Sequence, residues 1–251
     1  MKVIRVELGK GQLLAMPEPE RAFFLTLGHI LNELNALTRM MYWAAGTPAK
    51  ENSPEDHGRF AVVLLLVRLL AGKLNEAWEF FQRSFFGAGL SKRYEPQLDD
   101  MAESALGLLK RYFGSRNHVH VIRNDFAFHY SPQEISAVLP KVEDRLPVYL
   151  EREVVPNNLF YSSEMLLAQA LLEAIMDEND TDPYDSLVKE LFDVSAWFAQ
   201  ASDGLLEAIL MNHGELRISG PEEVQFEALE NFQDVTIPWF TDTSHVRSGD
   251  N

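Results

Sequence analysis

The chain has 251 residues, a formal net charge of −16 and no cysteine. Its length is sufficient for a hydrophobic core that needs no metal or disulfide to hold it together. The absence of cysteine excludes disulfide frameworks, thiolate metal sites and a cysteine nucleophile. With 46% hydrophobic and 24% charged residues, the composition is that of a globular protein and not of a disordered one.

Hydropathy predicts no segment that crosses a membrane. A membrane span needs about 18 apolar residues without charges, and the longest apolar run, Phe60–Val67, is followed at once by Arg68. The first twelve residues also lack the apolar core of a signal peptide. We therefore predict a cytoplasmic protein with no membrane partner.

Apolar residues recur at helical spacing over the first half of the chain. The first eight residues alternate apolar and charged side chains, which predicts a short strand or an extended arm. Long helices are predicted for residues 17–45, 54–86 and 96–113, and a less regular helix for residues 116–130. Ser131-Pro132-Gln133-Glu134 is a typical helix start, with Ser as the cap and Pro in the first turn. That helix should reach about Arg145 unless Pro140 ends it earlier.

The second half of the chain combines helices with β-like segments. Residues 146–162 carry a β-like stretch between two prolines, which predicts a hairpin or an extended excursion. Ser162 or Ser163 should then cap a helix that runs to about Asp177, and a further helix is expected over residues 184–212. The tail is expected to be irregular, with a strand near Val224–Phe226. The prediction is an all-α bundle in residues 1–145, extended by residues 146–251 packed on the same core.

The charge is distributed unevenly along the chain. Residues 173–234 contain 16 acidic and two basic residues, a composition typical of a solvated surface that favours solubility. Such a surface would also repel nucleic acid or bind a basic protein partner. The longest basic stretch without an acidic residue extends from Lys110 to Arg123. Lys110, Arg111, Arg116 and His120 within it are the predicted phosphate-binding residues.

The one segment with recognisable chemistry is residues 116–130, which holds three of the seven histidines and two Arg-Asn pairs seven residues apart. An arginine side chain is always charged and grips phosphate oxygens with two parallel hydrogen bonds. An imidazole exchanges a proton near neutral pH. In RNA the 2′-hydroxyl is a built-in nucleophile, so these two groups suffice in principle for cleavage without a metal or another cofactor.

Arg123-Asn124-Asp125-Phe126-Ala127-Phe128-His129 resembles the Arg-x(4–6)-His motif of the HEPN superfamily. The resemblance implies an up-down helical bundle with the motif late in the bundle. Many family members are metal-independent endoribonucleases of toxin–antitoxin and phage-defence systems, and they usually form homodimers in which the two motifs meet. At the matching positions, Arg123 would bind phosphate, Asn124 would orient it and His129 would act as base or acid.

Three open points accompany this prediction. In an ideal α-helix Arg123 and His129 would point about 120° apart, so they converge only if the helix loosens before Ser131 or if His129 serves a second subunit. Alternatively, His118 and His120 on a strand could bind zinc or iron with Asp125 or His129, but on a helix they would lie about 200° apart. The third possibility is a non-catalytic, all-helical protein–protein interaction module, since a net charge of −16 opposes unaided binding of nucleic acid.

Overall fold

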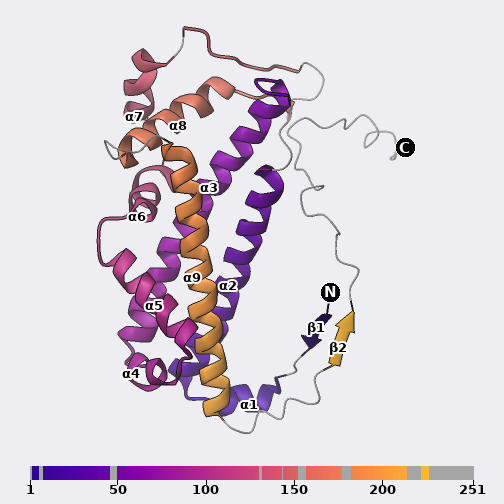
Figure 1. The fold of residues 1–251 in the computed structure, drawn as a ribbon, viewed down its shortest axis with the longest axis vertical. Helices are drawn as coiled ribbons and strands as arrows, with labels where there is room; N and C mark the ends of the chain where they lie inside the picture. Colours follow the sequence, from indigo (N-terminus) through magenta and orange to yellow (C-terminus); the bar gives the residue numbers. More distant parts are fainter. Residues whose placement is uncertain are drawn as a thin grey trace. The chain divides into compact units, whose positions relative to one another are not determined.

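The structure is a computed structural model that describes residues 2–5, 8–45, 50–129, 132–142, 144–151, 157–176, 182–213 and 222–225. The described residues are mostly helical (Figure 1), which confirms the predicted all-α class. The α-helices are α1 (Lys10–Ala15), α2 (Glu18–Ala45), α3 (Pro54–Phe81), α4 (Ser91–Tyr94), α5 (Asp100–Phe113), α6 (His118–Ile122), α7 (Pro132–Val138), α8 (Tyr161–Ile175) and α9 (Pro183–Asn212). Two π-helical turns, η1 (Gln82–Phe86) and η3 (Arg123–Ala127), extend α3 and α6, and 3₁₀ turns occupy Glu95–Gln97 (η2) and Leu139–Lys141 (η4).

The chain forms two compact units, and each unit combines separate parts of the sequence. The first unit consists of Met1–Ala36, Lys73–Asn117 and Phe192–Glu230. The second unit consists of Leu37–Gly72, His118–Leu191 and Asn231–Asn251. Each unit therefore takes segments from both sides of residue 145, where we expected the chain to divide.

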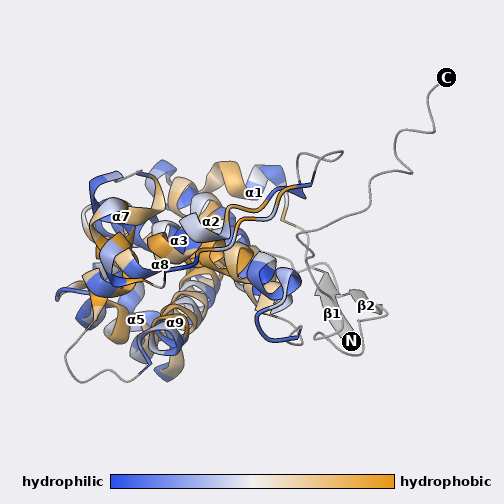
Figure 2. Ribbon diagram, turned by 90° about the horizontal axis from the view of Figure 1, so that it is seen from above, coloured by the Kyte–Doolittle hydropathy of each residue, from blue (hydrophilic) through white to orange (hydrophobic). Residues whose placement is uncertain are grey.

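Aromatic side chains from three helices fill the core of the first unit. The ring of Phe23 on α2 stacks on Phe80 and Phe85 at centroid distances of 5.4 and 5.2 Å. Phe81 on α3 makes an edge contact with Phe198 on α9, with ring centroids 5.6 Å apart. These contacts place the first half of α2 beside the end of α3 and the second half of α9. Their hydrophobic faces point inward, and hydrophilic residues cover the outside (Figure 2).

A buried charge cluster also stabilises the first unit. Glu20 on α2 is only 4% exposed, and its carboxylate accepts hydrogen bonds from Arg93 on α4 and His213 after α9, both at 2.5 Å. The hydroxyl of Tyr94 is buried beside this carboxylate, and its pKa is raised by burial and by Glu20. A buried carboxylate with two charged or polar partners is far less costly than one left alone.

In the second unit α6 and α7 both pack against α8. The apolar stripes of these short helices and of the neighbouring halves of α3 and α9 are fully or almost fully buried. They include Val67, Leu70, Val119, Ile122, Leu171 and Leu187. Burial of these side chains is the main favourable term for helices as short as α6 and α7, because isolated helices of five to seven residues are not stable in water.

The predicted long helices are confirmed for α2, α3 and α9, and the first turns of α3 and α9 have recognisable caps. Ser53 Oγ accepts the backbone N–H of Asp56 at the start of α3, and Asp182 Oδ1 accepts that of Asp185 at the start of α9. In each case proline follows the capping residue, at a position where a missing N–H costs nothing.

The starts of two predicted helices were wrong. The helix expected from Pro96 begins at Asp100, because Leu98 is extended and Asp99 caps the helix by accepting the N–H of Ala102 at 2.7 Å. Helix α8 begins at Tyr161 after Phe160, without a serine cap. The helix after residue 131 ends at Val138, and Pro140, which we expected as an early end, lies in the 3₁₀ turn that follows. Helix α1, which follows the predicted arm, was not expected.

The predicted β-like segments are present. Strand β1 (Lys2–Arg5) pairs antiparallel with β2 (Glu222–Gln225), with Val3 opposite Val224. In the excursion after residue 146, Tyr149 and Leu159 exchange two backbone hydrogen bonds of 2.8 and 2.9 Å. The predicted cap Ser131 lies outside the described residues, as does most of the predicted irregular tail.

Candidate functional site

The motif lies where α6 widens into the π turn η3. Val119 and Ile122 of α6 and Phe126 of η3 are buried in the second unit and fix this segment to its neighbours. At Phe128, with φ −125° and ψ 3°, the chain leaves the helix. Single π turns are rare and occur frequently at functional sites. The helix therefore loosens before residue 131, which was one of the two conditions under which Arg123 and His129 could converge.

Three of the predicted site residues form a hydrogen-bonded chain on this segment. Arg123 Nη1 donates to Asn124 Oδ1 at 3.0 Å, and Asn124 Nδ2 lies 2.8 Å from His120 Nε2. Because the Asn124 amide nitrogen is a donor, His120 Nε2 must be the acceptor in this arrangement. Nε2 is therefore the ring nitrogen that could accept a proton from another molecule when the bond to Asn124 opens.

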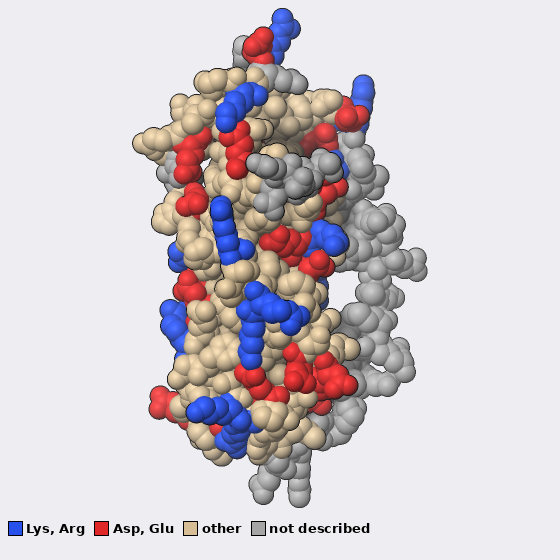
Figure 3. Space-filling view, turned by 60° about the vertical axis from the view of Figure 1, so that its left-hand side comes forward, with Lys and Arg blue, Asp and Glu red and all other residues tan. Residues whose placement is uncertain are grey.

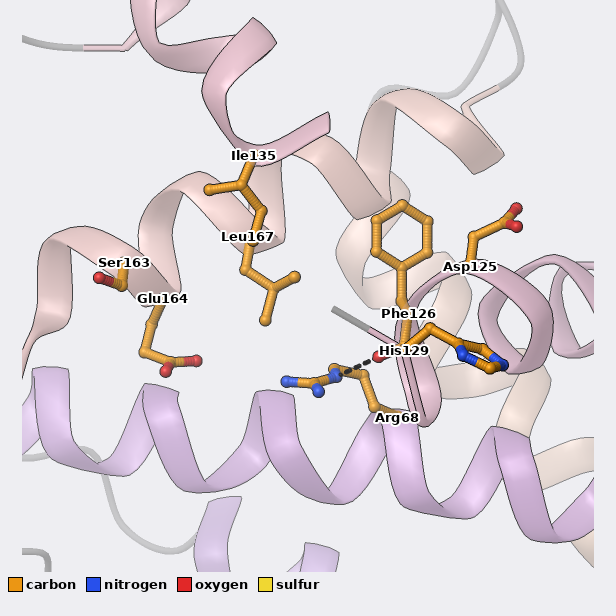
Figure 4. A pocket seen from close by; sticks show the side chains of 8 residues that line it. All are labelled: Arg68, Asp125, Phe126, His129, Ile135, Ser163, Glu164 and Leu167. Carbon is orange, nitrogen blue, oxygen red and sulfur yellow. Dashed lines mark hydrogen bonds between the residues drawn. The ribbon is translucent and has the colours of Figure 1, made fainter. Parts of the chain in front are cut away.

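His129 follows the π turn and lines a half-open cavity of about 180 Å³ (Figure 4). The cavity is lined by Arg68, Asp125, Phe126, His129, Ile135, Ser163, Glu164 and Leu167. Arg68 Nε of α3 donates a 2.8 Å hydrogen bond to the carbonyl oxygen of Phe126 and so ties the π turn to α3. Burial raises the pKa of the Glu164 carboxyl on α8, and the nearby Arg68 charge partly opposes this rise.

A glycine on α3, Gly72, also shapes this region. The ring of Phe128 lies directly over Gly72, where an added Cβ would come within 2.6 Å of Phe128 Cε2 and 3.4 Å of Ala127 Cβ. Glycine at this position therefore allows the end of the π turn to approach α3 closely. The His129 side chain, one residue further on, is exposed at the cavity.

The three other predicted phosphate ligands belong to the first unit. Lys110 on α5 forms an ion pair with Glu95 at 2.7 Å, and its ammonium group lies 5.1 Å from the centre of the Phe86 ring. Arg111 and Arg116 are exposed on and after the same helix. The structure thus groups His120, Arg123, Asn124 and His129 in one unit and these cations in the other.

Of Arg116, Arg123 and His129, only His129 lines the cavity described above. Arg123 lies on the π turn and donates a hydrogen bond to Asn124. Figure 3 shows basic and acidic side chains interspersed on the face that it draws, without a broad basic surface. Contacts with an anionic ligand on that face must therefore be made by individual side chains.

The two histidines of the alternative metal site have different partners. His118 Nδ1 lies 2.7 Å from Glu190 Oε2 on α9, whereas His120 contacts Asn124. Both histidines lie on a helix, where we predicted that they would diverge. In the part of the chain that the structure describes, no three His, Asp or Glu side chains come close enough to hold a metal ion.

A second polar cluster connects α3, α8 and the excursion of the second unit. His57 is 7% exposed; its Nδ1 lies 2.8 Å from the Tyr149 hydroxyl, and its ring stacks on Tyr161 at 3.7 Å. Burial lowers the pKa of His57, and the Asp56 charge opposes this. The partners of His57 are two tyrosines that hold neighbouring segments, so we interpret this cluster as structural.

Arg68 and Glu164 are the site residues that the sequence analysis missed. Arg68 directly follows the apolar run of α3, and a charge inside a buried stripe was a usable signal. Glu164 lies on a different helix and gave no local signal.

None of the described helices is long and apolar enough to cross a membrane. The chain matches no protein-family model, and no curated protein or solved structure is significantly similar to it.

Proposed function

We propose that the second unit binds single-stranded RNA and cleaves it without a metal ion, as the resemblance to HEPN proteins implies. The observation that supports this proposal best is the hydrogen-bonded chain of His120, Asn124 and Arg123 on the π turn. It combines a permanent cation and an imidazole within one turn of the chain, and His129 follows on the same segment.

In the proposed reaction the 2′-oxygen of a ribose attacks the adjacent phosphorus. The 2′-O–P bond forms, the P–O5′ bond breaks, and the products are a 2′,3′-cyclic phosphate and a 5′-hydroxyl. One imidazole takes the proton from the 2′-hydroxyl, and a second group returns a proton to the leaving 5′-oxygen. Arg123 stabilises the extra negative charge on the phosphate oxygens, because a guanidinium stays charged throughout.

We assign the two proton-transfer roles to His120 and His129. His120 is joined to Arg123 through Asn124, and its Nε2, which accepts from Asn124, can act as base. His129 is the residue that the family motif implies, and it is exposed at the neighbouring cavity. In a homodimer, which the resemblance also implies, one of the two could act on RNA held by the other subunit.

The test is cleavage of a single-stranded RNA by the purified chain in EDTA. Arg123→Ala, His120→Ala and His129→Ala should each lower the rate by about 100-fold or more, the usual loss when a proton-transfer group or a group that stabilises the developing charge is removed. The matched control is His29→Ala, which removes an exposed histidine on α2 whose contact is Glu33 at 3.9 Å; it should cleave at the wild-type rate.

Two results would contradict the proposal. One is a folded wild-type chain that leaves RNA intact, and the other is equal cleavage by all five proteins, which would indicate a contaminating nuclease. Either result would favour the non-catalytic interaction module. If the site is shared between two subunits, a mixture of Arg123→Ala and His129→Ala chains should recover part of the activity that each has lost.

A further inference from the structure

The cavity beside the motif presents two opposite charges between apolar walls. Arg68 projects from α3 and Glu164 from α8, so that the guanidinium and the carboxylate face each other (Figure 4). Phe126, Ile135 and Leu167 form the apolar part of the lining. A flat polar ring with apolar faces would match this combination of groups.

The hydrogen bond of Arg68 to the π turn fixes the direction of its guanidinium. Nε is occupied by the Phe126 carbonyl oxygen at 2.8 Å, and the Nη atoms extend toward Glu164. Within the described part of the chain, Arg68 acts on Glu164 only through its charge, and Glu164 has no hydrogen-bond partner. A half-buried carboxylate without a partner is costly, and a ligand that donates hydrogen bonds to it would remove that cost.

We propose that this cavity binds a guanine base of the RNA strand, with Glu164 accepting hydrogen bonds from the base and Arg68 donating to it. The inference rests on the proposed function. Guanine presents an acceptor, O6, next to two donors, N1–H and N2–H₂, on one edge. A carboxylate can accept both donors at once while a guanidinium donates to O6.

The other three bases satisfy this pair of groups less well. Adenine and cytosine each offer one amino donor beside an acceptor, and uracil offers one donor between two acceptors. Only guanine gives the carboxylate two adjacent donors. The cavity volume of about 180 Å³ is below the range of about 300–1,000 Å³ typical of drug-sized ligands, which agrees with a single ring system as the occupant.

Direct binding tests this inference without any cleavage. The affinities of the folded chain for GMP, AMP, CMP and UMP are compared by calorimetry. GMP should bind at least about tenfold more tightly than the others, since this is the usual discrimination by one good bidentate contact to a base. Glu164→Gln should remove this preference, because the amide places a donor against the N2 amino group.

Two further variants separate the cavity from general effects. Glu173→Gln changes another carboxylate of α8, whose contacts are Lys141 and Gln169, and should leave GMP binding unchanged. Leu167→Phe fills the apolar wall and should weaken GMP binding while the helical circular dichroism stays intact. Equal affinity for all four nucleotides, or unchanged GMP affinity in Glu164→Gln, would overturn the inference.

The outcomes also distinguish this inference from the proposed function. Selective GMP binding by a chain that does not cleave RNA would support the base-binding cavity and contradict the ribonuclease. Cleavage in EDTA that depends on Arg123 but shows no preference for guanine in defined oligonucleotides would support the ribonuclease and overturn the base-binding cavity.

Discussion

Gly204, near the middle of the second half of α9, allows this helix to approach α5 closely. A Cβ added at this position would lie 2.3 Å from the Cβ of Ala102 on α5. Carbon atoms that are not bonded reach optimal contact at about 3.5–4.0 Å, so the two helices would have to separate by roughly 1 Å. We predict that Gly204→Ala destabilises the protein, although alanine is the better helix former.

The size of the effect follows from two opposing terms. Forcing extra volume into a well-packed contact costs about 1–3 kcal/mol. Replacing glycine by alanine within a helix returns about 0.5–1 kcal/mol. With the middle value of each range, the net loss is about 1 kcal/mol, which corresponds to a fall in Tm of about 2–4 °C for a chain of this length.

The assay is urea and thermal unfolding followed by circular dichroism, with two control variants. Gly28→Ala lies inside α2, where nothing comes within 4 Å of an added Cβ, and it should raise stability. The double variant Ala102→Gly/Gly204→Ala moves the methyl group to the other helix, where its nearest remaining neighbours are Leu98 Cδ2 at 3.5 Å and Ala102 Cα at 3.8 Å. The reasoning is refuted if Gly204→Ala alone is not destabilising, or if the double variant is no more stable than it.

Three further predictions concern the second unit. Burial lowers the pKa of His57 below its ordinary 6.5, so the unfolded chain binds a proton more readily than the folded one. The free energy of unfolding should therefore fall as the pH drops below about 6.5. Unfolding measured at several pH values should show a smaller fall for His57→Gln. Arg68→Ala leaves the Phe126 carbonyl oxygen without its charged donor and should cost about 1.5–3 kcal/mol in urea unfolding; an unchanged midpoint would contradict this contact. Gly72→Ala should displace the ring of Phe128, which lies 2.6 Å from the added Cβ, and hydrogen exchange of residues 123–129 should increase; unaltered exchange would show that the ring accommodates the methyl group.

The helices of this chain could be predicted from sequence because the apolar residues of their buried faces recur at short, regular intervals. Apolar residues at intervals of three and four located α2, α3 and α9 to within one residue at their predicted starts. The wrongly predicted helix starts depend on which single residue acts as the N-terminal cap. Asp99 and Ser162 are both good caps by residue type, and only the tertiary structure decides that the first is used and the second is not.

The candidate site was predictable only in part, for the same reason. Arg123, Asn124 and His120 lie within four residues of one another, so their proximity follows from any helical turn. Lys110, Arg111 and Arg116 are near them in sequence but belong to the other compact unit. Arg68 reaches the motif from 58 residues away, and no local pattern connects it with Phe126 or Glu164.

The π turn explains why His129, which follows Arg123 by six residues, is exposed and not buried. In a continuous α-helix, a residue seven positions after the fully buried Ile122 would return to the same inward face, and that residue is His129. The wider turn of η3 and the exit of the chain at Phe128 break this periodicity, and His129 is exposed at the cavity instead. The hydrogen bond from Arg68 to Phe126 and the close contact of Phe128 with Gly72 both stabilise this departure from the helix. The chemistry that we propose for the motif therefore depends on α3, which lies outside the motif, and Gly72→Ala should impair it without changing any residue that we place against the RNA.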